Sequence, residues 1–308
     1  MMVLHPVERV IMTIIGALIF VDVFLIWWKG IAVGLEFFLA SIILGFLLAV
    51  VGQIGRRHGW QRVGDTTTAT SLFVGYAVAC ALFNLVLLPR PSVPIDAVLV
   101  RIDAWLGYSW PALCAWIANY PAFNDLLRAV YLMTTPQYVG TMILLGVLLD
   151  RRRLLGMAFG TVLGSLTGIF IWALFPSGGA SAHWKLDEEI DKIVRPVVDS
   201  RYGAELYRLY AEGVVDVATI EVTGLIGFPS FHAVMGLITL LAAWPYHVFR
   251  LGLIGMNLLL APAILVQGGH NLVDLIAGTA ITFVVWRVGL AIYDALDQPA
   301  TGVRLSPA

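Results

Sequence analysis

The chain has 308 residues, of which 59% are hydrophobic and only 13% are charged, and its mean hydropathy is +0.87. These values lie outside the usual range of soluble domains and indicate an integral membrane protein. The formal net charge of -1 argues against a nucleic acid partner, because binding a phosphate backbone needs a basic surface. Both cysteines, Cys80 and Cys114, have apolar neighbours, so we expect buried thiols rather than a disulfide.

Apolar runs of about 20 residues, long enough to cross a bilayer, recur along the chain with charged residues at their borders. The first run lacks a small-residue cleavage site, so we interpret it as a span and not as a signal peptide. We predict an all-α polytopic bundle with eight transmembrane helices, at residues 9–28, 31–53, 68–89, 126–149, 154–175, 230–249, 251–268 and 271–293.

Two more polar stretches interrupt the apolar runs. Residues 90–125 mix Pro, Trp and Tyr with charges of both signs, which is typical of a segment lying in the membrane interface, and we expect it to cover the bundle. Residues 176–225 contain many acidic and basic side chains and are predicted to form the one substantial aqueous loop.

Arginines of the short loops predict the orientation, because short cytoplasmic loops are enriched in Lys and Arg. The arginines predicted to share one side are Arg56, Arg57, Arg62, the triplet 151–153 and Arg250, with Arg9 and Arg304 near the termini. We therefore expect a plasma or inner membrane protein with both termini in the cytoplasm and the long loop outside.

Two histidines lie near predicted helix starts. His232 follows Pro229 in GFPSFHAVMG, and His270 comes 38 residues later in GGHNLVDLIAG. Two crossings of roughly 19 residues return a chain to the face that it left, so both histidines are predicted at the outer face. Pro229 suits the first turn of one helix, and Asn271 or the glycines before it suit the start of the other. Helix N-termini carry unpaired N–H groups and partial positive charge, which favour an anion.

Asp274 lies four residues after His270, one helical turn away, where its carboxylate can accept the imidazole N–H and orient the other ring nitrogen. A histidine held in this way is a competent nucleophile, and His232 could donate a proton to a leaving oxygen. The pattern predicts phosphoryl transfer through a phosphohistidine. A zinc site made of the same three residues is the less favoured alternative.

The stretches PSFH and GGHNLVDLIAG resemble the second and third motifs, PSGH and SRxxxxxHxxxD, of the type 2 phosphatidic acid phosphatase superfamily. They are most similar to the branch of inositol phosphorylceramide synthase, with a large residue after the serine and an HxxxDLxxG ending. The resemblance covers roughly residues 68–293 and implies a six-helix catalytic core. Residues 1–67 would add two N-terminal helices, and residues 294–308 a cytoplasmic tail.

The same resemblance implies roles without a metal or cofactor: His270 as the nucleophile, Asp274 as its orienting partner and His232 as the acid. Ser230 and the backbone amides that follow it, beginning with Phe231, would hold phosphate oxygens.

The departures from the motifs concern the basic residues. Ile264 stands where the third motif has its arginine. The first motif, KxxxxxxRP, is found only as the shorter KIVRP, which makes Lys192 and Arg195 candidates for a phosphate clamp. His183 and Lys185 are weaker candidates for substrate contacts, from a segment that resembles one in the same branch. Arg128 is a further candidate, with an interface anchor as the alternative.

The sequence thus predicts a membrane enzyme acting on a lipid-linked phosphate of a phospholipid or sphingolipid. With water as the acceptor it would be a phosphatase, and with an alcohol or polyol it would be a phosphotransferase. The alternative is a transporter or lipid-binding membrane protein of the same fold. Asp22 and Glu36 lie in the outer halves of the first two predicted spans, where we expect them to pair with basic residues; contact with a substrate headgroup is the less favoured reading.

Overall fold

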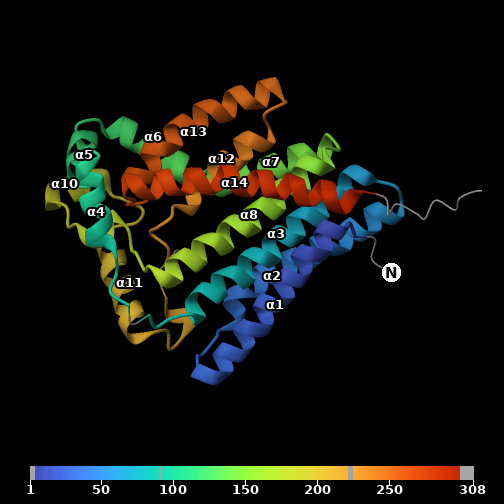
Figure 1. The fold of residues 1–308 in the computed structure, drawn as a ribbon, viewed down its shortest axis with the longest axis horizontal. Coiled ribbons are helices and arrows are strands. Elements are labelled where there is room, and N and C mark those ends of the chain that lie inside the picture. Colours follow the sequence, from blue (N-terminus) through green and yellow to red (C-terminus); the bar gives the residue numbers. More distant parts are fainter. Residues whose placement is uncertain (1–3, 91, 221–224, 299–308) are drawn as a thin grey trace, which may run out of the picture.

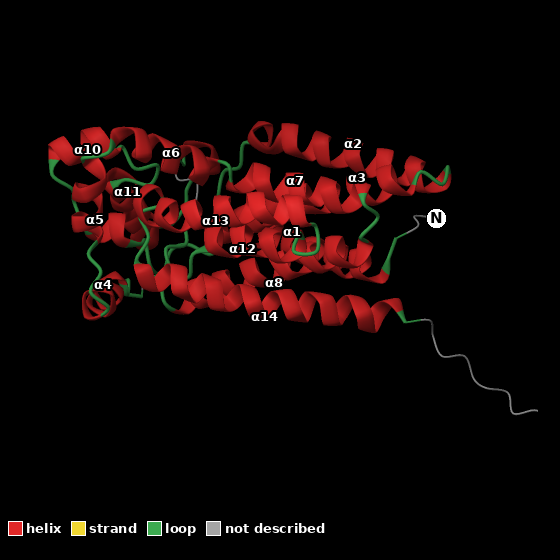
Figure 2. Cartoon of the chain, turned by 90° about the horizontal axis from the view of Figure 1, so that it is seen from above, coloured by secondary structure: helices red, strands yellow, loops and turns green. Residues whose placement is uncertain are grey.

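The computed structural model describes residues 4–90, 92–220 and 225–298. Within these ranges the chain forms helices and no strand, with one isolated bridge between Ala32 and Asp216. Long helices run side by side along one axis, and a group of short helices lies at one end (Figures 1 and 2). The predicted all-α bundle is confirmed.

Among the residues that the structure describes, six helices are long and apolar enough to cross a membrane, and a bent pair would make a seventh span. The six are α1 (Pro6–Lys29), α2 (Leu35–Arg57), α3 (Gln61–Val86), α8 (Arg151–Leu174), α13 (His247–Gln267) and α14 (Leu272–Asp297). The bent pair is α6 (Pro121–Leu132) and α7 (Thr134–Val147), which meet at 49°. The chain is therefore an integral membrane protein.

The structure differs from the prediction in two of the eight spans. Residues 126–149 are broken between α6 and α7, because Pro136 has no N–H for the carbonyl of Leu132. Residues 230–249 contain α12 (Phe231–Ala242), which has 12 residues, followed by the start of α13. Twelve residues rise about 18 Å, less than the roughly 30 Å of the hydrocarbon core, so α12 is too short to cross it alone.

The ends of α1 and α14 follow local capping rules. The His5 side chain accepts the Val7 N–H and Pro6 occupies the first helical position, which starts α1; Gly30, with φ 66°, ends it. Asn271 is the N-cap of α14, as predicted, and Asp274 completes a capping box with it.

The short helices form what we call the roof, at the end of the bundle opposite the start of α1 and the end of α14 (Figures 1 and 2). Its members are α4 (Asp96–Trp105), α5 (Trp110–Ala118), α9 (Ala180–His183), α10 (Glu188–Val194) and α11 (Ser200–Glu212). They come from the two stretches that interrupt the apolar runs in the sequence. A 3₁₀ turn, Val217–Thr219, leads from the roof toward α12.

Charged side chains join the helices at the opposite end. Arg56 Nη2 lies 2.6 Å from Glu8 Oε1 and 2.7 Å from Asp65 Oδ1, so one buried guanidinium links α1, α2 and α3. Arg152 on α8 pairs with Asp294 on α14 at 2.6 Å. These contacts show that arginines predicted to share a side do lie at the same end of the bundle.

Glycines allow α8, α12 and α14 to pack closely. A Cβ on Gly289 of α14 would lie 2.4 Å from the carbonyl oxygen of Gly156 on α8. A Cβ on Gly278 would lie 2.3 Å from the carbonyl oxygen of Ser230. The first turns of α12 and α14 are therefore held against each other, beneath the roof.

Candidate active site

His270 and Asp274 form a buried pair at the start of α14. His270 Nδ1 lies 3.2 Å from Asp274 Oδ2, and their side chains are 7% and 0% exposed. The same carboxylate oxygen accepts the backbone N–H of Asn271 at 2.8 Å. Because a carboxylate accepts and does not donate, the ring proton belongs on Nδ1, and Nε2 presents its lone pair.

Ser230 lies on the other side of the His270 ring. Its Oγ is 3.4 Å from His270 Nε2, and its side chain is buried at the N-cap of α12. The Ser230 N–H donates to the backbone carbonyl of Asp274 at 3.1 Å. This bond joins the two sequence motifs directly, so Ser230 is held close to the free nitrogen of His270.

His232 and His270 line the same cavity, as the two predicted crossings required. The cavity has a volume of about 70 Å³. The His232 ring stacks on Tyr131 of α6, with a centroid distance of 4.3 Å and an interplanar angle of 22°. The other residues lining it are Gly178, Val198, Tyr202, Leu206, Leu225, Ile226, Gly227 and Gly268.

Comparison with known families matches residues 97–288 to the PAP2 superfamily. The chain belongs to the PAP2 superfamily. The matched region runs from α4 to α14 and contains His232, His270 and Asp274, while α1, α2 and α3 precede it. No curated protein and no solved structure gave a significant match. Membership indicates a phosphatase-type enzyme.

A carboxylate that the sequence reasoning missed holds the start of α14 in this PAP2 protein. Asp103 on α4 accepts the backbone N–H groups of Leu272 and Val273, both at 3.0 Å. Burial raises the pKa of Asp103, and the two N–H bonds act against this rise. The anion at the N-terminus of α14 is therefore a carboxylate of the protein itself, which already binds these two N–H groups.

Pro229 is not in the first turn of α12 as predicted. Ser230 is the N-cap and Phe231 is the first helical residue, so Pro229 precedes the helix. The Ser230 side chain makes no capping hydrogen bond in the structure, and its hydroxyl faces His270 instead. Phe231 is half-buried and packs beside a core cluster of α7, α8 and α12.

Asp96 holds the loop between α8 and α9 that forms one wall of the cavity. Its carboxylate accepts the Ser177 hydroxyl at 2.7 Å and the N–H groups of Gly178 and Gly179 at 3.1 and 2.9 Å. The Tyr207 hydroxyl donates to it at 2.9 Å. Neither Asp96 nor Asp103 has a local sequence signal, because each acts on a segment far along the chain.

The predicted basic residues lie outside the cavity. Lys192 is exposed and 3.9 Å from Glu188, and Arg195 pairs with Asp125 at 3.1 Å. Arg128 Nη1 donates to the carbonyl oxygen of Arg195 at 2.5 Å. In the described part of the chain, the residues lining the cavity include no lysine or arginine.

The two weaker candidates also lie on the roof. His183 lines a separate hollow of about 520 Å³, together with Arg90 and Tyr207. Lys185 is exposed just after α9. Neither lines the cavity of His232 and His270. Over the described ranges, no group of three or more His, Cys, Asp or Glu side chains is arranged to hold a metal ion.

Proposed function

We propose that this PAP2 superfamily protein transfers a phosphoryl group from a lipid-linked phosphate to water or to an alcohol, through a phosphohistidine on His270. One observation carries the proposal. Asp274 holds Nδ1 of His270, so Nε2 faces Ser230 at the cavity that His270 shares with His232. A nucleophile, an orienting carboxylate and a second imidazole are the groups that this chemistry needs.

In the first step, His270 Nε2 attacks phosphorus and the bond from phosphorus to the lipid oxygen breaks. His232, in its protonated form, gives its proton to the departing oxygen, so a neutral alcohol leaves. The proton on His270 Nδ1 remains in its hydrogen bond to Asp274. The charge of Asp274 stabilises the positive phosphorylated ring that forms.

In the second step, His232 acts as the base. It takes a proton from water or from an acceptor hydroxyl, whose oxygen attacks phosphorus while the bond to His270 Nε2 breaks. The products are free phosphate or a new phosphate ester, and both histidines return to their starting protonation states.

Helix α12 supplies the groups best placed to bind the phosphate oxygens. The Ser230 hydroxyl faces the nucleophile, and the N–H groups of Phe231 and His232 belong to the first turn, where the helix dipole favours an anion. Lys192 and Arg195 remain candidates for oxygens that protrude from the cavity. Their exposed ion pairs are each worth only about 0–1 kcal/mol, so a phosphate can replace their partners at small cost.

The size of the cavity suits a phosphoryl group better than a whole lipid. Its volume of about 70 Å³ is well below the roughly 300–1,000 Å³ of pockets that enclose drug-sized ligands. We infer that the lipid chains stay in the membrane while the headgroup enters beneath the roof. The arginines at the opposite end favour a cytoplasmic location for that end and an extracytoplasmic site.

The acceptor of the phosphoryl group determines the reaction: with water the protein is a phosphatase, and with an alcohol it is a phosphotransferase. Phe231 after Ser230, and Ile264 in place of the arginine of the third motif, favour the branch of inositol phosphorylceramide synthase and hence an alcohol acceptor. Both reactions use the same three residues. The difference lies in whether the roof excludes water from the phosphohistidine.

The test is to incubate the purified protein, in lipid nanodiscs, with a panel of lipid phosphates, with and without inositol or sugar acceptors, and to identify the products by mass. Free phosphate alone makes the protein a hydrolase, and a new phosphate ester makes it a transferase. His270→Gln should remove the product, and His247→Gln, at the exposed start of α13 on the opposite end of the bundle, is the matched control. If the parent protein forms no product and His270→Ala still moves lipid across the membrane, the non-catalytic alternative replaces the proposal.

A further inference from the structure

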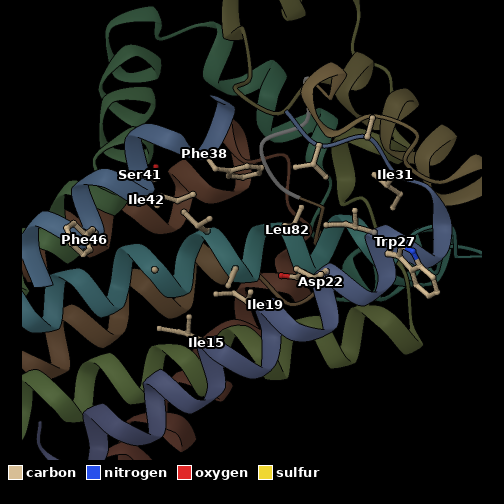
Figure 3. A pocket seen from close by; sticks show the side chains of 18 of the residues that line it. Ile15, Ile19, Asp22, Trp27, Ile31, Phe38, Ser41, Ile42, Phe46 and Leu82 are labelled. Carbon is tan, nitrogen blue, oxygen red and sulfur yellow. The ribbon is translucent and has the colours of Figure 1, made fainter. Parts of the chain in front are cut away.

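A large cavity lies between α1, α2 and α3, the three helices that precede the matched family region. Its volume is about 1010 Å³, and it shares no lining residue with the cavity of the two histidines. Most of the wall is apolar, with Ile15, Ile19, Phe38, Ile42 and Leu82 among the side chains that Figure 3 shows around it.

Asp22 is the one acidic residue among the described residues of this wall. It is 1% exposed, and neither carboxylate oxygen has a hydrogen-bond partner among the described residues. Figure 3 shows its side chain directed from α1 toward α3, beside Leu82. The expected pairing with a basic residue is therefore wrong for Asp22. Lys29, on the same helix, donates instead to the carbonyl oxygens of Val86 and Leu88, both at 2.7 Å.

An unpartnered buried carboxyl group is costly, so the occupant of the cavity should supply a hydrogen bond to it. The surroundings restrict what that occupant is. Exposed apolar side chains flank the cavity, with Phe20 74%, Val23 61% and Phe46 68% exposed, as expected for helix faces in contact with lipid. A molecule that enters between these helices needs an apolar body as well as a polar head.

We propose that the cavity is a second lipid site, which binds the chain of an amphiphile whose hydroxyl or amino group donates a hydrogen bond to Asp22. The site is separate from the proposed phosphoryl-transfer site and does not depend on its activity. Both kinds of amphiphile, the alcohol and the amine, carry a hydrogen-bond donor at the head of an apolar chain.

The geometry orients the occupant. The lining residues of α1 run from Ile15 to Trp27, which spans about 18 Å along the helix. Asp22 lies five residues before Trp27, the last residue of α1 that lines the cavity, and is about 7.5 Å from it along the helix. The donor group therefore lies at the level of Asp22, and the chain runs toward Ile15 and Ala49.

The upper wall of this second site is hydrogen-bonded to the segment that follows the roof helix α11. The Ala32 N–H donates to the Val215 carbonyl at 2.8 Å, and the Val217 N–H donates to the Ala32 carbonyl at 2.9 Å. Ile31, Ala32 and Val33 all line the cavity. Backbone pairing thus fixes the loop that follows α1 in the upper wall, and we expect the occupant to enter from the side, between helices.

The test uses three photoreactive probes with a diazirine in the same alkyl chain: an alkanol, the corresponding alkylamine, and the methyl ether of the alkanol. Each is added to nanodiscs that contain the full chain, and the labelled peptides are identified by mass. We expect the alkanol or the alkylamine to label α1–α3 about tenfold more than the ether, a ratio that corresponds to about 1.4 kcal/mol from one hydrogen bond. The stronger of the two identifies the donor.

Two variants and a control variant distinguish probes that bind in the cavity from probes that contact the helices nonspecifically. Asp22→Leu removes the acceptor and should reduce both donor probes to the level of the ether. Gly75→Phe fills the cavity and should reduce all three probes, since a Cβ there meets only Ile15 Cδ1, at 3.8 Å. Gly16→Phe, outside the lining, has nothing within 4 Å of its Cβ and should leave labelling unchanged.

Equal labelling of the three probes in the parent protein would overturn the proposal, and so would an unchanged preference in Asp22→Leu. If Asp22→Leu fails to fold, the probe comparison in the parent and in Gly75→Phe still decides the question. Repeating the labelling in His270→Gln separates the two proposals, because loss of phosphoryl transfer should leave labelling of α1–α3 intact.

Discussion

The backbone N–H of Ser230 donates a hydrogen bond to the backbone carbonyl of Asp274 at 3.1 Å. This one contact holds the start of α12 against the first turn of α14. Gly278 makes the approach possible, because any side chain there would collide with the Ser230 carbonyl. The proposed nucleophile and its phosphate-binding serine are thus positioned by main-chain atoms.

Replacing the orienting carboxylate tests its role most directly. Asp274→Asn should lower kcat by about 10²–10⁴ with little change in KM, because the ring of His270 loses the charge that stabilises its phosphorylated form. Release of phosphate from a lipid phosphate measures the effect. Asp294→Asn, which removes an exposed ion pair with Arg152, is the control and should retain full activity. Equal loss in both variants would contradict the assignment.

The two histidines should differ in a trapping experiment with a ³²P-labelled substrate that has a good leaving group. His232→Gln should still form an acid-labile phosphohistidine and lose it slowly, because the second step lacks its base. His270→Gln should form none. Covalent label on the His270→Gln protein would show that another residue is the nucleophile.

Tyr131 should position His232 by stacking. Tyr131→Ala should lower kcat roughly 2–10-fold, in line with about 0.5–1.5 kcal/mol for an aromatic pair, while Tyr131→Phe should keep most of the activity. The pH–rate profile tests whether Tyr131 only positions His232. In that case Tyr131→Ala should lower the maximal rate and leave the shape of the pH–rate profile unchanged. A matching loss in Tyr131→Phe would instead assign a role to the hydroxyl.

Asp103 should matter for stability as well as for the site. Asp103→Ala removes the acceptor for two N–H groups of α14, and a lost helix cap costs about 0.5–2 kcal/mol. We expect a lower Tm together with reduced turnover. Asp150→Ala, which removes the N-cap of α8 at the opposite end of the bundle, is the matched control and should lower the Tm but leave turnover unchanged.

Close packing of α8 and α14 can be tested by adding one methyl group. Gly289→Ala places a Cβ 2.4 Å from the Gly156 carbonyl oxygen and should destabilise the fold by about 1–3 kcal/mol. Gly16→Ala adds the same group to open space on α1 and should not lower the Tm. Thermal melting of both variants in one detergent makes the comparison; equal Tm values would show that the helices can separate.

The sequence by itself was sufficient for features that depend on local spacing. Long apolar runs predicted the bundle, and the interval of four residues predicted the contact of His270 with Asp274. The out-and-back path of the chain correctly predicted that His232 returns to the same end, although α12 is shorter than the predicted crossing. These follow from the rise of a helix and the thickness of a membrane, which are properties of short segments.

Only the tertiary structure decided contacts between distant segments. No local sequence signal predicted the hydrogen bonds of Asp103 to the start of α14 or the stacking of Tyr131 on His232. The same holds for the surface positions of Lys192 and Arg195, and for Asp22, which has no hydrogen-bond partner among the described residues. The reason is physical: helix periodicity determines which face a side chain occupies, but the packing of whole helices determines what that face meets.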